Sequence, residues 1–199
     1  CGQPAYNSGY RDEALAVART QLACFKRDIP VVVPSGSCTG MIRVHWPELF
    51  AGEPDEAQAL AVVGRTYELT EFLVDVLDVR LKVVGEPTKI AIHTSCAARR
   101  EAEVGDHIQS LVAQLDGVEL LVQEREAECC GFGGTFAVKQ ADVSGAMVKD
   151  KTDALLATGA TRVISQDCGC LMNIGGAFEH QGDGPGTQHI AEFLLERTS

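Results

Sequence analysis

Two adjacent cysteines open a glycine-rich turn in the stretch Glu128-Cys129-Cys130-Gly131-Phe132-Gly133-Gly134-Thr135-Phe136. A disulfide between neighbouring cysteines would close a small, strained ring, so the pair is poorly suited to that use. Two thiols on one turn, with glycines that let the backbone wrap closely around a bulky object, suit a metal cluster better. The stretch therefore indicates a soft-metal site.

Further cysteines lie at long range on both sides of this pair. Cys96 precedes it, and Cys168 and Cys170 follow it, in the pattern C-x32-CC-x37-C-x-C. Sets of cysteine thiolates bind iron–sulfur clusters, and four of them also satisfy a closed zinc site. We therefore predict that metal ligands from three separate loops come together: Cys96, Cys129, Cys130, Cys168 and Cys170.

The composition is typical of a folded protein without membrane segments. The chain has 199 residues, of which 45% are hydrophobic, and it can bury a core as one or two domains. Its net charge of −11 argues against nucleic acid and anionic membrane surfaces as partners. No apolar run approaches the ~20 residues of a transmembrane helix. Eight unevenly spaced cysteines favour metal chemistry over a secreted disulfide framework, so we expect a cytoplasmic protein.

Strands and helices alternate along the sequence. Helical spacing of apolar residues predicts helices at about 12–26, 55–77, 101–115 and 142–158, and a last helix from Thr187, which suits an N-cap. Short apolar runs predict strands at 31–33, 90–93, 118–122 and 163–165. Several of these strands end at a cysteine, and sheets of this kind place their sites at the carboxyl ends of strands. The predicted fold class is α/β with mostly parallel sheets.

The two halves of the chain repeat each other. The alignment pairs four positions of one half with four of the other: Cys1 with Cys130, Gly2 with Gly131, Ser35 with Asp167, and Cys38 with Cys170. A break at Gly85-Glu86-Pro87 predicts two units, 1–85 and 86–199. The first unit lacks counterparts of Cys96 and Cys129, so we expect it to be truncated at its N-terminus. A cysteine directly before Cys1, and a strand ending in another about 33 residues upstream, would complete it.

Four stretches of the sequence carry a family resemblance: Cys1-Gly-Gln-Pro-Ala-Tyr-Asn-Ser-Gly-Tyr10, Pro34-Ser-Gly-Ser-Cys38, Cys129-Cys-Gly-Phe-Gly-Gly-Thr-Phe136 and Cys168-Gly-Cys-Leu-Met-Asn-Ile-Gly-Gly176. With them the chain resembles the cysteine-rich CCG-domain proteins, most closely the lactate-utilization protein A group of iron–sulfur oxidoreductases. Related domains occur in heterodisulfide reductase. The resemblance implies two tandem Rossmann-like α/β CCG repeats and a 4Fe-4S cluster on the CCG cysteines. It also implies that companion iron–sulfur subunits share the oxidation of a 2-hydroxy acid, L-lactate, to pyruvate.

The sequence departs from the heterodisulfide reductase pattern at one ligand position. That pattern ends in CxxC, which requires a cysteine where this chain has Asp167. Four thiolates remain for an ordinary cubane cluster: Cys96, Cys129, Cys130 and Cys170. A fifth ligand would have to come from Cys168 or Asp167. In the first unit, Cys1 and Cys38 are the corresponding metal-binding candidates. The alternative to a redox role is a zinc-stabilised assembly module.

Other residues near the cysteines have less specific interpretations. His93 ends a predicted strand just before Cys96, and we interpret it as a hydrogen-bonded core histidine in preference to a proton donor. Arg99 and Arg100 suit the neutralisation of an anionic cluster, the binding of a carboxylate substrate, or an exposed helix start. Cys24 falls inside a predicted helix and is assigned to packing. No residue receives a catalytic assignment, and no flavin or nicotinamide motif is visible in the sequence.

Overall fold

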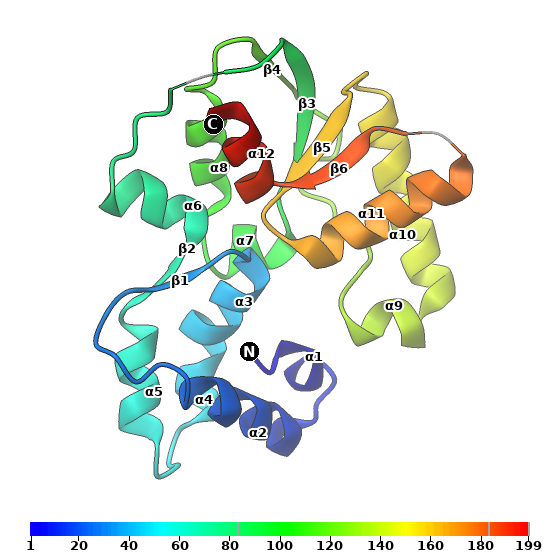
Figure 1. Cartoon of the computed structure of the whole chain (residues 1–199). Helices are drawn as coiled ribbons and strands as arrows, with labels where there is room; N and C mark the ends of the chain where they lie inside the picture. Colours follow the sequence, from blue (N-terminus) through cyan, green and yellow to red (C-terminus); the bar gives the residue numbers. More distant parts are fainter. Residues whose placement is uncertain (83, 183, 199) are drawn as a thin grey trace.

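Two parallel β-sheets, one in each half of the chain, form the frame of the molecule in the computed structural model (Figure 1). The structure describes residues 1–82, 84–182 and 184–198. The first sheet pairs β1 (Val31–Val33) with β2 (Thr66–Glu68). The second has the order β4-β3-β5-β6, with β3 (Thr88–His93), β4 (Val118–Leu121), β5 (Arg162–Ser165) and β6 (Gly186–His189). The predicted α/β class with parallel sheets is confirmed.

Helices connect and cover these strands. Those of the first half, with two π-helical turns, are α1 (Gln3–Tyr6), α2 (Arg11–Leu22), α3 (Gly36–Gly40), η1 (Met41–His45), α4 (Trp46–Leu49), α5 (Glu56–Val63), α6 (Leu69–Glu71) and η2 (Phe72–Val76). Those of the second half are α7 (Cys96–Arg100), α8 (Gly105–Val112), α9 (Thr135–Lys139), α10 (Ala141–Leu156), α11 (Cys168–Gln181) and α12 (Ile190–Thr198).

Both faces of the second sheet are buried under helices (Figure 1). Ile90 and Ile92 of β3 enter one apolar core with residues of α8 and α12. Ala91, between them, enters the opposite core with residues of α10 and α11. Successive side chains of a strand point to opposite faces, so a strand covered on both sides is apolar throughout. This accounts for the uninterrupted apolar run in β3.

The first half has a separate core built around two aromatic rings. Trp46 and Phe50 are fully buried, with ring centroids 5.4 Å apart. Residues of α2, among them Leu22, complete this core. The indole Nε1 of Trp46 donates a hydrogen bond to the carbonyl oxygen of Cys1 at 3.0 Å. The core therefore also fixes the start of the described chain.

The two halves meet where α3 packs against α7. A Cβ atom on Gly36 would lie 2.3 Å from the Cβ of Ala98, so only glycine allows this approach. Leu73 and Leu81 precede the break at 85–87, yet they pack against the core of the second sheet. The division into units 1–85 and 86–199 stays a prediction.

The helix predicted at 55–77 is wrong as one continuous element. In the structure α5 ends at Val63, and residues 66–68 form β2, which pairs with β1. The Glu68 side chain then accepts backbone hydrogen bonds from Thr70 and Glu71, which starts α6 with a capping box. The prediction failed because the apolar residues before and after this break recur at the same helical spacing.

Two other predicted helix starts need correction. Thr187 lies within β6, so it is not an N-cap, and α12 begins at Ile190. The predicted helix at 101–115 is replaced by α8, which begins at Gly105 after Glu103 adopts a left-handed φ of 56°. The remaining predicted helices and the four predicted strands are confirmed within a few residues. Among the described residues, no helix combines the length and apolar character needed to cross a membrane.

Candidate metal centre

Three loops at one edge of the second sheet carry the cysteines. Cys96 begins α7 directly after β3, Cys129 and Cys130 follow β4, and Cys170 lies in the first turn of α11 after β5. These strands are neighbours in the order β4-β3-β5, and they are parallel, so their carboxyl ends meet. We call Cys96, Cys129, Cys130 and Cys170 the second cysteine set.

The four thiols of this set form a connected row in the order Cys96, Cys129, Cys130, Cys170. Hydrogen bonds from Cys130 and Cys96 lower the pKa of Cys129 to about 2, and the N–H of Gly131 donates to its sulfur at 3.3 Å. A hydrogen bond from Cys130, with a further interaction from His93, lowers the pKa of Cys170 to about 6. The bonds to Cys129 are the main cause of the raised pKa of Cys96 and of Cys130. The row thus brings four candidate ligands together, and thiolate is the metal-binding form of each.

The turn that carries Cys129 and Cys130 is held between α10 and α11. Gly131 has a φ of 83°, and a Cβ there would lie 2.7 Å from the carbonyl oxygen of Ser144 in α10. The Ser144 hydroxyl donates to the carbonyl oxygen of Gly131 at 2.8 Å. Asn173 of α11 donates from Nδ2 to the carbonyl oxygen of Cys130 at 2.7 Å. These contacts fix the direction in which both sulfurs project.

The glycine between Cys168 and Cys170 has a packing reason. A Cβ atom on Gly169 would lie 2.5 Å from the ring of Phe132. The aromatic ring of the CCGF turn therefore rests directly on the backbone of α11. Phe132 and Cys170 both pack against the same apolar core. The CCGF turn and the Cys168-Gly169-Cys170 segment are therefore packed directly against each other.

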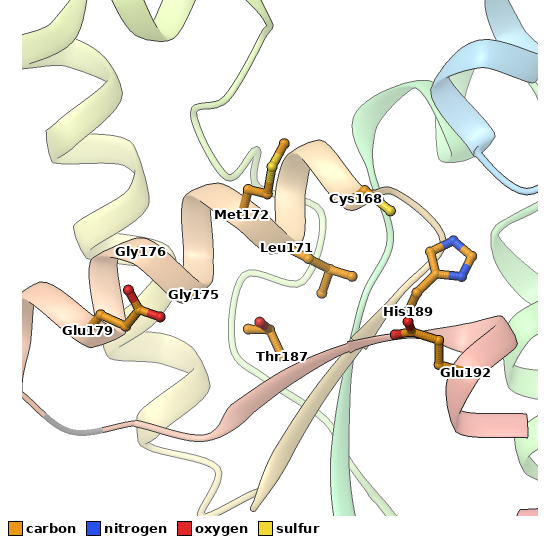
Figure 2. Close-up of a pocket in the computed structure, with 9 residues that line it drawn as sticks. All are labelled: Cys168, Leu171, Met172, Gly175, Gly176, Glu179, Thr187, His189 and Glu192. Atoms are coloured by element: carbon orange, nitrogen blue, oxygen red, sulfur yellow. The ribbon is translucent and has the colours of Figure 1, made fainter. Parts of the chain in front are cut away.

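Cys168 lies outside the second cysteine set. Its side chain is exposed, whereas that of Cys170 is partly buried in the row. Residues two apart on a helix are rotated by about 200°, so the two thiols cannot share one face of α11. Cys168 instead lines an open cavity of about 410 Å³ with Leu171, Met172 and His189 (Figure 2). The structure does not bring it to the other four.

Asp167 contacts the first half of the chain. Its Oδ1 atom accepts hydrogen bonds from the Ser35 hydroxyl at 2.8 Å, the Ser37 hydroxyl at 2.6 Å and the Ser37 N–H at 3.0 Å. It therefore binds the first turn of α3, beside Cys38. One of its two oxygens is thus engaged away from the metal centre.

His93 is a residue of this site that our sequence interpretation missed. It lies at the carboxyl end of β3 and is 1% exposed, yet neither ring nitrogen has a hydrogen-bond partner of suitable geometry among the described residues. One of its nitrogens and the sulfurs of Cys130 and Cys170 all lie within 4.8 Å of one another. Its place at a strand end among cysteine loops was the available signal. It is a core histidine, as expected, but its polar neighbour is the Cys170 thiol, whose pKa it helps to lower.

Cys1 and Cys38 form a separate pair in the first half, which we call the first cysteine pair. Their sulfurs are 3.3 Å apart. The Ser35 side chain caps α3 by accepting from the N–H of Cys38, and Gln3 donates to the carbonyl oxygen of Ser37 at 3.2 Å. The structure thus brings these two predicted ligands together. Cys24 is exposed, and its thiol donates to the carbonyl oxygen of Thr20, one turn earlier in the chain.

The donors of the second cysteine set fit a soft-metal group. Thiolate sulfur selects zinc, Cu(I) and iron–sulfur clusters. In a tetrahedral zinc site with Zn–S bonds of about 2.3 Å, all sulfurs lie about 3.8 Å apart. Cys96 and Cys129 do not share the mutual 4.8 Å spacing of His93, Cys130 and Cys170. The side chains as they stand therefore do not place all four sulfurs within reach of one ion.

Comparisons with known proteins identify relatives over nearly the whole chain. A family model of the cysteine-rich CCG domain matches residues 1–43 and 90–175. Lactate utilization protein A of Geobacillus sp. (strain WCH70) is 43% identical over 201 residues, covering 99% of this chain and 83% of the relative. The protein of the same name from Bacillus subtilis (strain 168) is 42% identical over 200 residues, with the same coverage. That of Oceanobacillus iheyensis is 40% identical over 195 residues, covering 98% and 80%.

Proposed function

Because this chain belongs to the cysteine-rich CCG-domain family, together with the lactate utilization A proteins, we propose that it acts in lactate utilization as an iron–sulfur electron-transfer subunit. The complete assembly would oxidise a 2-hydroxy acid, L-lactate, to pyruvate. The observation that carries the proposal is the row of four thiols, delivered by three loops to one edge of a parallel sheet.

The residues of the second cysteine set would hold a 4Fe-4S cluster, which supplies one-electron transfer when it is bound. Cys130 is 1% exposed, and Phe132 covers the adjoining backbone of α11, so the protein limits water access on that side. The positive charge of Arg100 acts on Cys96 and opposes the rise in its pKa. An anionic thiolate cluster would gain from such a charge.

Substrate chemistry would belong to companion subunits of the assembly. The chain carries no recognisable motif for a flavin or nicotinamide cofactor, which normally accepts the hydride of a 2-hydroxy acid. We therefore propose companion iron–sulfur subunits as partners, in the cytoplasm, where thiols stay reduced. The purified chain alone should reduce no electron-accepting dye when L-lactate is added.

Metal analysis after strictly anaerobic purification tests the proposal. We expect stoichiometric iron and acid-labile sulfide, a brown protein and broad absorption at about 400 nm that bleaches on reduction. A colourless protein with stoichiometric zinc would replace the redox role by a zinc-stabilised assembly role. One observation favours that second candidate: His93, Cys130 and Cys170 are mutually close, and Cys129, which contacts Cys130, would complete the Cys₃His set of a structural zinc site.

A further inference from the structure

His93 is a buried polar residue whose ring makes no well-formed hydrogen bond. Its side chain is 1% exposed, and among the described residues neither Nδ1 nor Nε2 has a hydrogen-bond partner of suitable geometry. Buried polar groups are normally hydrogen-bonded, and an exception calls for a specific explanation, such as a role in binding an ion. His189 shows the ordinary situation, because its Nε2 lies 3.0 Å from the carbonyl oxygen of Gln166 and its Nδ1 accepts from the N–H of Ala191.

The neighbours of His93 are metal-ligand candidates. A ring nitrogen lies with the sulfurs of Cys130 and Cys170 in a group whose members are all within 4.8 Å of one another. Two thiolates on one ion can be at most about 4.6 Å apart, and a thiolate and an imidazole nitrogen at most about 4.4 Å, given bonds of about 2.3 and 2.1 Å. A single ion can therefore reach all three donors with little movement of the side chains.

Other candidates for an additional ligand are less well placed. The thiol of Cys168 is exposed and lies outside the row. Asp167 directs Oδ1 to Ser35 and Ser37 in the first half of the chain. His93 projects from β3, the strand whose end also leads to Cys96, and β3 lies between the two strands that lead to the other ligands. It is thus at the centre of the converging loops.

We propose that His93 is a nitrogen ligand of the metal group held by the second cysteine set, bound beside Cys130 and Cys170. In a four-iron cluster it would be a fifth protein donor, in addition to the four thiolates. This inference rests on the proposed function for the identity of the metal group. Neutral imidazole is a common ligand for zinc and iron, so a mixed nitrogen–sulfur site is chemically ordinary. The position of the buried ring against two thiols then has a physical reason, since one of its nitrogens would bind the metal.

The test combines nitrogen isotopes with three variants of the full chain, purified anaerobically. Pulsed electron paramagnetic resonance of the paramagnetic cluster state should show strong coupling to a directly bound nitrogen, which changes when ¹⁵N-histidine replaces ¹⁴N-histidine. His93→Cys should keep the metal, because a thiolate replaces the imidazole, but it should lose the nitrogen coupling. His93→Ala should bind metal at least about tenfold more weakly, given that outer ligand partners alone contribute 10–100-fold. His180→Asn, at an exposed position of α11, should leave both readouts unchanged.

Different experimental outcomes contradict the role of His93 and the proposed function. An intact cluster without a directly coupled histidine nitrogen would overturn the role of His93 and leave the proposed function standing. A protein that contains only zinc would overturn the redox proposal. In that case X-ray absorption at the zinc edge decides on His93, because the His93→Cys variant must lose a nitrogen neighbour that the wild type shows. A chain that binds no metal contradicts both.

Discussion

Cys130 holds a central position among the thiols of the second cysteine set. It contacts Cys129 on one side and Cys170 on the other, and it packs with Leu155 and Val163 in an apolar core. Its hydrogen bonds to Cys129 and Cys170 and its burial raise its pKa. Metal binding would require its deprotonated form, because the thiolate is the ligand. Cys130 therefore links the core of the second half directly to the metal centre.

Replacing Cys130 by Ser should remove most of the bound metal and lower the stability of the second half, since metal binding contributes to folding. Metal per chain, measured by elemental analysis after anaerobic purification, checks this. Cys24→Ser and Cys168→Ser are matched controls, because both thiols are exposed and lie outside the row. They should retain wild-type metal content. Equal loss in Cys168→Ser and Cys130→Ser would contradict the ligand assignment drawn from the structure.

At this scale the sequence predicts which residue types form the site but not how each side chain is turned. The spacing of the CC pair and of Cys96 and Cys170 was sufficient to predict that these loops converge. It could not show that Cys170 joins the other thiols while Cys168 does not, because the rotation of α11 about its axis depends on packing. The ring of Phe132 against Gly169 sets that rotation. The sequence also could not reveal that His93 lies against Cys130 and Cys170, since this depends on atoms brought in by other loops.

The strands that the sequence missed are β2 and β6, which are polar in sequence. β2 has the sequence Thr-Tyr-Glu, and β6 has Gly-Thr-Gln-His, so neither shows an apolar run. The central strands β3 and β5 are buried on both faces and were therefore visible as apolar runs. β2 is buried at Thr66 and Glu68, where Glu68 accepts hydrogen bonds from Thr70 and Gln166. A strand whose buried side chains are polar and hydrogen-bonded gives no apolar run, so the sequence pattern did not predict it.

Gly131→Ala should damage the turn that presents Cys129 and Cys130. The residue has a φ of 83°, and a methyl group would lie 2.7 Å from the carbonyl oxygen of Ser144. Left-handed backbone costs about 1–2 kcal/mol for a non-glycine residue, and the clash adds to it, so the free energy of unfolding should fall by at least about 2 kcal/mol. Urea denaturation of the anaerobically purified variant measures the change, and metal content should fall with it.

Gly145→Ala provides the matched control in the neighbouring helix. Gly145 lies inside α10, and an added Cβ would meet no atom within 4 Å. Alanine in an open helical position should raise the free energy of unfolding by roughly 0.5–1 kcal/mol, because glycine loses more backbone entropy on folding. If both variants change stability equally, the turn at Gly131 is not the constrained element described above.

On the scale of the whole molecule, the two halves are joined by residues that the repeat alignment pairs. Ser35 and Asp167 occupy equivalent positions, and the structure shows them hydrogen-bonded to each other at 2.8 Å. The equivalent ends of β1 and β5 therefore face each other across the contact between halves. Buried side chains extend this contact, since Gln166 donates from Nε2 to the hydroxyl of Thr70 at 2.9 Å. The sequence predicted the repeat, but it carried no signal for contacts between residues so far apart along the chain.

Asp167→Ala should loosen the attachment of the first half to the second. The substitution removes the acceptor shared by Ser35 and by the hydroxyl and N–H of Ser37, which lies in the first turn of the helix carrying Cys38. Hydrogen bonds to a charged group contribute about 1.5–3 kcal/mol each, so the free energy of unfolding should fall by at least about 2 kcal/mol. Hydrogen exchange should accelerate at the amides of α3, while the amides of β3 in the second sheet should stay protected.

Asp167→Asn separates the loss of the acceptor from other effects of the substitution. Asparagine retains a carbonyl oxygen that can accept the same three hydrogen bonds, so its α3 amides should exchange more slowly than those of Asp167→Ala. Ser37→Ala removes a single hydroxyl donor and should lie between the wild type and Asp167→Ala, which keeps the comparison possible if the alanine variant at position 167 folds poorly. Wild-type exchange rates at α3 in Asp167→Ala would show that other contacts, such as Gly36 against Ala98, hold the two halves together without it.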